Sequence, residues 1–472
     1  MSILTSRKLG NRAEDLPSTS SLLKRTLSIS IPAAMETLFV GLITLADTIM
    51  VGSVGKEALA AVSISNQPVF ITLAACIGLN AGVIAIISRR HGEGNREGAN
   101  RTLRQAMLMG IITSLVMSVL AFFLAEPFLL LAGAKSDTIE LAKTYFRIVS
   151  FALVANYLRL IICSALRACG NTRTTLVTNI VANLVNIFLN YCLIGGNLGF
   201  PELGVTGAAI ATVTGNVIAL VIAFLAVYKR KNSFLSISFL DDWKLDKNTC
   251  KLILKISSNA FIEQLFMRIG FFLNAMIINN LGTDRTAANA IINSVIALGF
   301  NITDGFSIGA STLVGQSLGE KRVDKAIAYG RLSQIISFFL SFIMISVSII
   351  FREPLSRLFL TDDDISVVYM AADVMKIAAF VLLPQSLQWV TTGILRGAGD
   401  TKYTARSSMI SVMIVRPAVS FLLCYPIIIG EVTIWAGLGL LGAWLGMFID
   451  QALRFILNNT RFQNLKWAKI NV

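Results

Sequence analysis

Long apolar stretches separated by short polar connections dominate the pattern of this chain. Each stretch holds about 20 residues or more, which is enough for a helix to cross the hydrocarbon core of a bilayer. We place twelve of them at residues 29–51, 62–87, 105–125, 139–166, 175–196, 204–228, 252–281, 287–316, 331–351, 366–395, 405–430 and 436–457. The pattern predicts an all-α polytopic membrane protein with twelve transmembrane helices.

The composition and the charge distribution agree with this prediction. Of the 472 residues, 55% are hydrophobic and 14% are charged, and the mean hydropathy is +0.71. The net charge of +14 would also suit a nucleic-acid-binding protein, but the basic residues gather in alternate connections, which is the positive-inside pattern. We therefore expect a cell (inner or plasma) membrane protein with both termini in the cytoplasm, an even number of spans and no nucleic-acid partner.

The two kinds of connection differ clearly in their charged residues. The basic ones include Arg7, Lys8, Arg12, Arg89, Arg90, Arg96, Lys229, Arg230, Lys231, Lys321, Arg322, Lys325, Arg454 and Arg461. The others are poor in Lys and Arg and include Glu57, Glu126, Asp137, Asp362, Asp363, Asp364 and Glu431.

The second half of the chain repeats the first. Glu36-Thr-Leu-Phe matches Glu263-Gln-Leu-Phe, and Leu166-Arg167 matches Leu395-Arg396 at almost the same offset in numbering. Six spans per half is an even number, so both halves enter the membrane from the same side, with a site expected between them near the midplane. We predict a cytoplasmic tail at 1–28, an amino-terminal lobe at 29–228, a flexible cytoplasmic linker at 229–251, a carboxy-terminal lobe at 252–457 and a cytoplasmic tail at 458–472.

Two carboxylates lie in the first apolar stretch, Glu36 near its start and Asp47 towards its end. A charged Asp near the bilayer centre costs about 2.5 to 3.5 kcal/mol on insertion scales, so such a residue faces a protein interior or a wet cavity and takes part in ion or substrate handling. The repeat gives Glu36 a twin in Glu263, whereas the equivalent of Asp47 is Asn274. The halves are chemically unequal, and Asp47 is the first candidate for binding a coupling ion.

An enzymatic activity is not indicated. Gly397-Ala-Gly399-Asp400 looks like the GxGD motif of intramembrane aspartyl proteases, but the repeat places Asn171 in the matching basic loop, so Asp400 is better interpreted as a turn or cap residue. The sole histidine, His91, excludes His-based triads and multi-histidine metal sites, and no Walker A motif occurs. We expect no enzyme and no cofactor.

The chain resembles the multidrug and toxic compound extrusion (MATE) transporters over nearly its whole length. The motifs that carry the resemblance are Pro32 to Glu36 followed by Ala46-Asp47-Thr48, the turn Gly92-Glu93-Gly94-Asn95, the run Leu166-Arg-Ala-Cys-Gly-Asn-Thr-Arg173, and Leu395-Arg-Gly-Ala-Gly-Asp400. The resemblance implies two six-helix lobes around a central cleft and the export of small, mostly cationic amphipathic compounds in exchange for Na+ or H+. We expect a monomer in the lipid bilayer.

The resemblance also implies which residues bind the coupling ion. Asp47 matches the cation-site aspartate of the amino-terminal lobe, and Asn186, Asn190 and Thr212 match polar residues around that site. Asn186 and Asn190 are four residues apart, so their amides share one helix face. These oxygen donors suit a Na+ shell or a hydrogen-bond network around a protonatable Asp. Alternatively, these four residues only form hydrogen bonds that hold neighbouring helices together. Asn190 departs from the members that have an acid there.

A second site, for substrate or a further cation, is expected in the carboxy-terminal lobe. Glu263 matches an acidic position that several family members use for this purpose, and Asn274 lies on the same span. In the alternative interpretation Glu263 only pairs with nearby Arg268. Gln385 replaces an acidic residue of many cation exporters, which weakens the prediction of a two-carboxylate Na+ site.

Three further residues are interpreted from their positions along the spans. Glu36 is a secondary candidate for the substrate or cation site; alternatively it lies near the cytoplasmic rim and pairs with Lys24 or Arg25. Pro384 and Pro417 fall inside predicted spans and are expected to kink them.

A rival function is that of a lipid-linked oligosaccharide or polysaccharide flippase from the same superfamily. Binding a pyrophosphate would favour an arginine-rich cleft. The predicted spans contain few arginines, with Arg159, Arg268 and Arg416 as the candidates, so we prefer the exporter.

Overall fold

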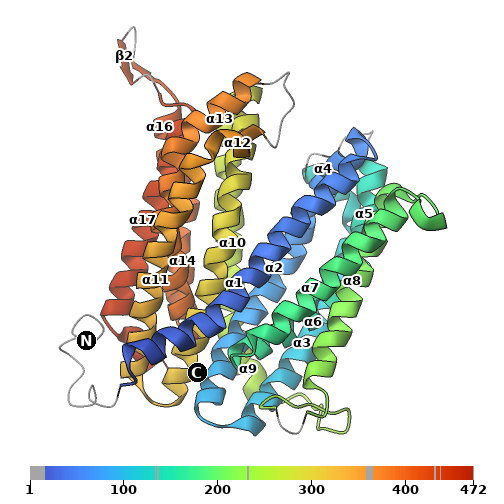
Figure 1. Cartoon of the computed structure of the whole chain (residues 1–472), viewed down its shortest axis with the longest axis vertical. Helices are drawn as coiled ribbons and strands as arrows, with labels where there is room; N and C mark the ends of the chain where they lie inside the picture. Colours follow the sequence, from blue (N-terminus) through green and yellow to red (C-terminus); the bar gives the residue numbers. More distant parts are fainter. Residues whose placement is uncertain are drawn as a thin grey trace. The chain divides into compact units, whose positions relative to one another are not determined.

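The computed structural model describes residues 16–132, 134, 138–230, 233–357, 365–429, 432–435 and 437–470. Among these residues, eleven helices are long and apolar enough to cross a membrane, and one further pair, α5 and α6, is bent by 51°. If the bent pair is one span, the total is twelve. The prediction of an all-α polytopic fold is confirmed (Figure 1).

Some charged residues that entered the sequence analysis lie outside the described residues. They are Arg7, Lys8, Arg12, Asp137, Lys231, Asp362, Asp363, Asp364 and Glu431.

The helices of the first half follow one another with short connections. They are α1 (Thr19–Gly52), α2 (Lys56–Gly92), α3 (Arg96–Phe123), α4 (Ala125–Leu131), α5 (Ile139–Phe151), α6 (Leu153–Ala168), α7 (Thr172–Ile194), the short 3-10 turn Asn197–Gly199 and α8 (Gly204–Val227).

The second half repeats this order. It contains α9 (Lys247–Asn279), α10 (Thr283–Gly319), α11 (Val323–Ile350), α12 (Arg352–Arg357), α13 (Ile365–Ala378), the 3-10 turn Ala379–Val381, α14 (Leu382–Gly397), α15 (Thr401–Ser408), the π-helical segment Met409–Val415, α16 (Arg416–Cys424), β1 (Ile427–Ile429), β2 (Val432–Trp435), α17 (Leu440–Gln463) and the 3-10 turn Lys466–Lys469.

The Gly-Asn pairs in the repeated loops start helices. Gly94 and Gly170 have φ values of 70° and 81°, in the left-handed region that glycine tolerates. The next residue caps the helix: Asn95 accepts a hydrogen bond from Gly98 N at 2.8 Å, and Asn171 accepts one from Thr174 N at 3.3 Å. The same motif therefore ends one span and begins the next.

Two compact units make up the chain. Unit 1 comprises residues 16–34, 262–318 and 322–470, and unit 2 comprises residues 35–261 together with 319–321. Helix α1 contributes its beginning to unit 1 and the rest to unit 2, whereas α9 contributes its beginning to unit 2 and the rest to unit 1. Each half of the chain thus donates the start of its first helix to the other unit.

Close helix packing in unit 2 depends on small residues. Helices α7 and α8 run side by side (Figure 1), and a Cβ on Gly207 of α8 would lie only 2.5 Å from the carbonyl oxygen of Leu193 in α7. The central apolar core lies among α2, α3 and α6 and includes Leu103 and Ile161, both fully buried. These contacts hold the helices that carry the polar residues of unit 2.

The linker between the halves is docked against α3. Arg104 forms an ion pair with Asp241 at 3.1 Å, Gln105 Nε2 donates to Lys244 O at 2.8 Å, and the Gln105 Oε1 accepts from Asp246 N at 3.0 Å. The expectation of a flexible linker is therefore wrong for its described part, since polar side chains on the first turns of α3 bond its backbone.

Unit 1 packs with the same close contacts. Helix α14 contacts α11 and α17, and α16 contacts α17. A Cβ on Gly442 of α17 would lie 2.6 Å from the backbone of Leu423, which mirrors Gly207 against Leu193. At Gly305 of α10 the backbone of Ala34 approaches so closely that any side chain would collide with it.

Both prolines predicted to kink spans lie beside an interruption. Pro384 is the third residue of α14, directly after the 3-10 turn Ala379–Val381, and Pro417 follows the π-helical segment Met409–Val415. A proline cannot donate a backbone hydrogen bond to the preceding turn, which loosens the helix there.

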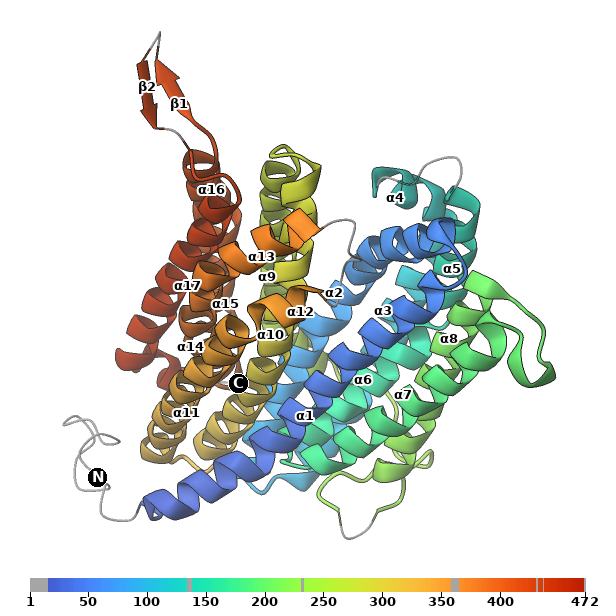
Figure 2. The same ribbon diagram turned by 45° about the horizontal axis from the view of Figure 1, so that its top comes forward.

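A small hairpin, not expected from the sequence, follows α16. Strands β1 and β2 pair antiparallel, with Ile429 opposite Val432, and extend from the end of α16 (Figure 2).

Candidate functional site

A buried ion pair connects α1 to α6 and α7 in unit 2. Arg167 Nη1 and Asn179 Nδ2 both donate to Glu36 Oε1 at 2.7 Å, and Thr175 Oγ1 donates to Glu36 Oε2 at 2.7 Å. The Glu36 residue is only 5% exposed. We call these four residues the Glu36 clamp, because both carboxylate oxygens of Glu36 accept hydrogen bonds from other helices than α1.

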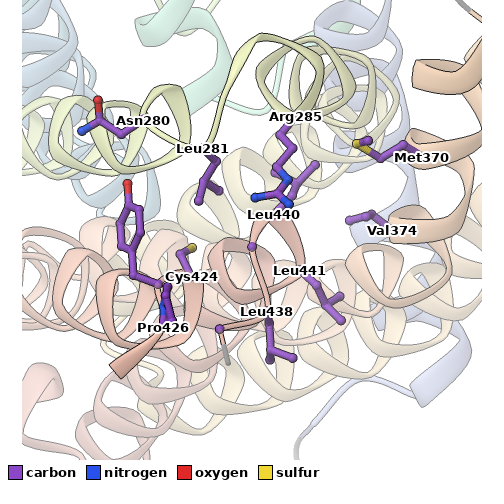
Figure 3. A pocket seen from close by; sticks show the side chains of 13 residues that line it. Asn280, Leu281, Arg285, Met370, Val374, Cys424, Pro426, Leu438, Leu440 and Leu441 are labelled. Carbon is purple, nitrogen blue, oxygen red and sulfur yellow. The ribbon is translucent and has the colours of Figure 1, made fainter. Parts of the chain in front are cut away.

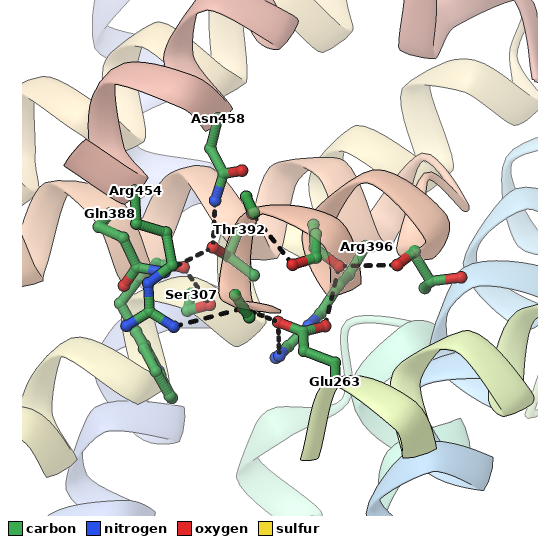
Figure 4. A network of polar contacts seen from close by, with 12 residues as sticks. Glu263, Ser307, Gln388, Thr392, Arg396, Arg454 and Asn458 are labelled. Atoms are coloured by element: carbon green, nitrogen blue, oxygen red, sulfur yellow. Dashed lines mark hydrogen bonds and ion pairs between the residues drawn. The ribbon is translucent and has the colours of Figure 1, made fainter. Parts of the chain in front are cut away.

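Unit 1 contains the same arrangement around Glu263 of α9. Arg396 Nη2 donates to Glu263 Oε1 at 3.0 Å, Ser408 Oγ donates to the same oxygen at 3.1 Å, and Thr404 Oγ1 donates to Oε2 at 2.8 Å (Figure 4). We call this set the Glu263 clamp. The partners in the two clamps are related by one constant offset in numbering, which pairs Arg167 with Arg396, Thr175 with Thr404, and Asn179 with Ser408.

The clamps correct two predicted pairings. Glu36 is buried and pairs with Arg167, so the expected pair with Lys24 or Arg25 is wrong. The ion-pair partner of Glu263 is Arg396, whereas the alternative interpretation expected Arg268. Both true partners lie far away in sequence, on a helix that packs within the same unit.

Each clamp has a second arginine, which comes from a different helix in the two units. In unit 2, Arg159 of α6 donates from Nη1 to Asn179 Oδ1 at 2.6 Å. In unit 1, Arg454 of α17 donates from Nη1 to Ser408 Oγ at 3.4 Å (Figure 4). The repeat therefore conserves a positive charge beside the clamp without conserving the residue that supplies it.

Unlike the glutamates of the two clamps, the Asp47 carboxylate forms its hydrogen bonds with neutral groups. Asn190 Nδ2 donates to Asp47 Oδ1 at 2.7 Å. With its amide nitrogen turned to the carboxylate, Asn186 donates to the two Asp47 oxygens at 2.8 and 3.2 Å, and its own oxygen accepts from Thr212 N at 3.2 Å. The structure thus brings together all four residues predicted for this site.

Asp47 differs from the acids of the clamps in having no cationic partner. Among the described residues, no Lys, Arg or His nitrogen lies within 4.0 Å of its carboxylate, although Asp47 is partly buried within an apolar helix. A carboxylate in this position can take up a proton or a small cation without first releasing an arginine.

Asn186 can serve either state of Asp47. With its nitrogen turned to the carboxylate it donates to the anion. With its oxygen turned there instead, it can accept from a protonated Asp47 or face a cation, and its nitrogen then lies 3.5 Å from Thr212 Oγ1. The first orientation satisfies both ends of the amide, whereas the second leaves the nitrogen only this long contact.

In the region of unit 1 that is equivalent to the Asp47 cluster, the acidic side chain is paired with an arginine. Leu193 and Leu423 make the same close contact with a glycine of the next helix, so we align the two halves on them after the π-helical segment. In this alignment Asn186 corresponds to Arg416. Arg416 Nε donates to Asp450 Oδ2 at 2.9 Å, and Asp450 is fully buried. Asn274, the equivalent of Asp47, carries a buried Oδ1 with no hydrogen-bond partner. Of the four residues predicted for the second site, Glu263, Asn274 and Gln385 belong to unit 1, and Glu36 belongs to unit 2.

Asp304 of α10 is a site candidate that the sequence analysis missed. Its Oδ1 accepts a hydrogen bond from Trp389 Nε1 of α14 at 2.8 Å. The signal was present in the sequence, since Asp304 is an acidic residue inside a predicted span. Gln385, one turn before Trp389, is 1% exposed and its Oε1 has no partner.

A pocket of about 550 Å³ lies in unit 1, away from all predicted site residues. Its walls come from the ends of α9, α16 and α17 and from α10 and α13 (Figure 3). Arg285 is the only charged residue among those that line it.

Repeated six-helix halves, matching buried clamps and an uncompensated carboxylate inside one span together define a multi-pass membrane transporter built from a tandem repeat. The sequence profile of the MatE family matches residues 32–192 and 260–422. The chain belongs to this family, whose members are transporters and not enzymes, which confirms the resemblance noted in the sequence.

Similar sequences cover almost the whole chain. A protein of Thermotoga maritima named "Probable multidrug resistance protein NorM" is 26% identical over 447 residues, which span 94% of this chain and 93% of that protein. A protein of the same name from Agrobacterium fabrum is 26% identical over 460 residues, 95% and 96% of the two chains. "Probable multidrug resistance protein YoeA" of Bacillus subtilis is 24% identical over 416 residues, 88% and 87% of the two chains.

Solved structures share the fold. One is described as the outward-facing conformation of a multidrug resistance MATE family transporter, with a TM-score of 0.85, 22% identity and coverage of 94% of this chain and 97% of that chain. A transporter from Pyrococcus furiosus, described as having a binding pocket of reverse polarity, gives the same TM-score, identity and coverage.

Proposed function

We propose that this protein is a secondary active multidrug exporter, which moves cationic or amphipathic organic compounds out of the cell in exchange for Na+ or H+ by alternating access. The relatives that span nearly the whole chain carry names of multidrug resistance proteins, which supports the substrate class. The alternation of basic and acidic connections supports an orientation with both termini in the cytoplasm.

The proposal rests mainly on Asp47. Its carboxylate is bonded by amides and has no arginine among the described residues, so binding a proton or Na+ there changes the net charge of the cluster. In the clamps a cation would have to displace an arginine that already neutralises the acid. Asp47 is therefore the coupling-ion residue in our proposal, with Asn186, Asn190 and Thr212 positioning it.

Glu36 and Glu263 take another role in this proposal. Their bonds to Arg167 and Arg396 connect the first helix of each half to the fourth span, and their bonds to Thr175 and Thr404 connect it to the fifth. Losing one partner of such a buried pair is strongly destabilising, because the other charge is left uncompensated. We infer that both glutamates hold their units together rather than bind substrate.

A flippase function is less well supported. Two of the three arginines that were candidates for a pyrophosphate site are engaged within their own units: Arg416 pairs with Asp450, and Arg159 bonds Asn179 and Asn156. Their guanidinium groups thus already bond protein oxygens, whereas a phosphate site would need guanidinium groups that are available.

Uptake of an ethidium-like cation into everted membrane vesicles tests the proposal, because the cytoplasmic face of the membrane points outward in such vesicles. We expect uptake driven by an imposed Na+ gradient at fixed pH, by a pH gradient at fixed Na+, or by both, and the pair of titrations identifies the coupling ion. Inward movement of one cation yields about 2.3 kcal/mol per 100 mV in either case, so the potential alone does not distinguish the two. Absence of uptake under both gradients would overturn the proposed function.

A further inference from the structure

Asp304 and Trp389 form a polar contact between two spans of unit 1. Asp304 lies in the middle of α10, and its Oδ1 accepts from the indole Nε1 of Trp389 in α14 at 2.8 Å. The two helices are also joined by Ser307 Oγ, which donates to the Trp389 carbonyl oxygen at 2.9 Å. Two hydrogen bonds therefore join α10 to α14 at this point.

A second aromatic ring belongs to the same group. Phe300 precedes Asp304 by four residues, so both lie on one face of α10. Its ring meets that of Trp389 edge to face, with centroids 6.2 Å apart and planes at 81°. One carboxylate and two aromatic rings thus gather on one side of the contact between α10 and α14.

This group lies at an accessible surface of unit 1. Phe300, Asp304 and Trp389 are each partly exposed, whereas Thr303 and Ser307 beside them are buried. A carboxylate that faced lipid at this depth would cost several kcal/mol, so the surface that carries Asp304 faces water or protein.

The charge of Asp304 is not neutralised within the described residues. Its bond to a neutral indole contrasts with Glu263 and Asp450 of the same unit, each of which pairs with an arginine. Gln385 lies one turn from Trp389 on α14, and its Oε1 is a buried acceptor without a donor. Asp304 therefore lacks a positively charged partner among the described residues, and Gln385 Oε1 lacks a donor.

We propose that Asp304, Trp389 and Phe300 form a recognition site for an organic ammonium or similar cation in unit 1. The carboxylate supplies the opposite charge, and the two rings supply dispersion and cation–π attraction for a flat, weakly hydrated cation. This inference rests on the proposed export of organic cations. It separates substrate recognition at Asp304 from ion coupling at Asp47, since the two residues belong to different units.

Binding of ethidium to the purified protein in lipid nanodiscs, followed by fluorescence, tests the site. Asp304→Asn keeps an oxygen that accepts from Trp389 but removes the charge, and we expect ethidium affinity to fall about tenfold. Trp389→Phe keeps a ring and should weaken binding less. Asp373→Asn is the matched control, because Asp373 is exposed and pairs only with Lys376 on the surface; it should bind ethidium as the wild type does.

The Asp47→Asn variant distinguishes the two proposals. If both are right, this variant binds ethidium normally in nanodiscs and fails to carry it into everted vesicles. Wild-type affinity in Asp304→Asn would overturn the inference while leaving the proposed function intact. An equal loss of affinity for a neutral dye of similar size would also overturn it, because the effect would then come from packing and not from charge.

Discussion

Glu36 and Glu263 occupy the same place in the two halves, and each accepts a hydrogen bond from an arginine, at 2.7 and 3.0 Å respectively. The two arginines, Arg167 and Arg396, are themselves equivalent in the repeat. In both halves, an ion pair with a buried glutamate thus joins the first helix to a later one.

Removing the charge from either clamp should destabilise its unit. We expect Glu36→Gln to lower the free energy of unfolding by about 3 to 5 kcal/mol, because it removes the buried carboxylate that the Arg167 guanidinium bonds. Glu263→Gln should have a similar effect through Arg396. Thermal unfolding of the purified variants in detergent measures this loss.

The exposed pair of Glu97 and Arg101 provides the control for the clamps. Glu97→Gln should change stability by about 1 kcal/mol or less, since both side chains are largely solvated. If Glu36→Gln were as stable as Glu97→Gln and had lost its response to the ion gradient, Glu36 would belong to the transport site instead.

Replacing Asp47 should separate transport from folding. Asp47→Asn keeps an acceptor for Asn190 but cannot change charge, so we expect gradient-driven uptake into everted vesicles to fall to background while the amount of protein in the membrane stays the same. Vesicle uptake and quantitative blotting measure the two effects. Drug resistance at the wild-type level in cells that carry this variant would refute the role given to Asp47.

The contact of Gly305 with α1 should tolerate no side chain. In Gly305→Ala, the added methyl group would meet the backbone of Ala33 and Ala34, and we expect a loss of about 1 to 3 kcal/mol in the free energy of unfolding. Gly52→Ala is the control, because its added methyl group would meet only Leu59, at 3.8 Å. Equal thermal stability of the two variants would contradict this packing.

Docking of the linker should depend on Asp246. Hydrogen bonds from the Thr249 hydroxyl and the Asn248 amide lower the pKa of Asp246 below its ordinary value of 3.8. Ionised Asp246 therefore stabilises the linker docked on α3 above pH 4. This stabilisation is lost as the pH falls through the lowered pKa of Asp246. Hydrogen exchange in residues 238–246 should accelerate under such acid conditions, after correction for intrinsic rates.

At neutral pH, Asp246→Ala should have the same effect. We expect trypsin to cleave after Lys244 or Lys247 severalfold faster in this variant, because the start of α9 loses its cap. Asp242→Ala, which removes a bond to Lys244 N alone, should change cleavage less. Equal cleavage in all three proteins would indicate that the bonds from Gln105 dock the linker without help from Asp246.

Much of the fold could be predicted from the sequence, because crossing a membrane requires about 20 apolar residues and leaves a visible pattern. Asp47 could also be singled out, since it is an acid within a span, but its neighbours Asn186, Asn190 and Thr212 were implied only by the resemblance to MATE transporters. The role of Asp47 and its neighbours in transport stays a prediction.

The clamps could not be predicted from local sequence, because Glu36 and Arg167 meet only after four spans have packed. The repeat nevertheless contained the signal, since both halves have Glu in the first span and Leu-Arg at the end of the fourth. The docked linker was missed for another reason: its polar composition is typical of a flexible tether, and the bonds that hold it come from side chains of α3.

The π-helical segment Met409–Val415 records how the halves diverged. A π turn takes up one residue more than an α turn, which accounts for the offset between the halves being larger by one after this segment than before it. The extra residue is thus accommodated within a single turn, instead of rotating every later side chain of the helix by about 100°. Thr404 and Ser408, before the segment, therefore make the contacts that Thr175 and Asn179 make in the other half, and Arg416, after it, pairs with Asp450.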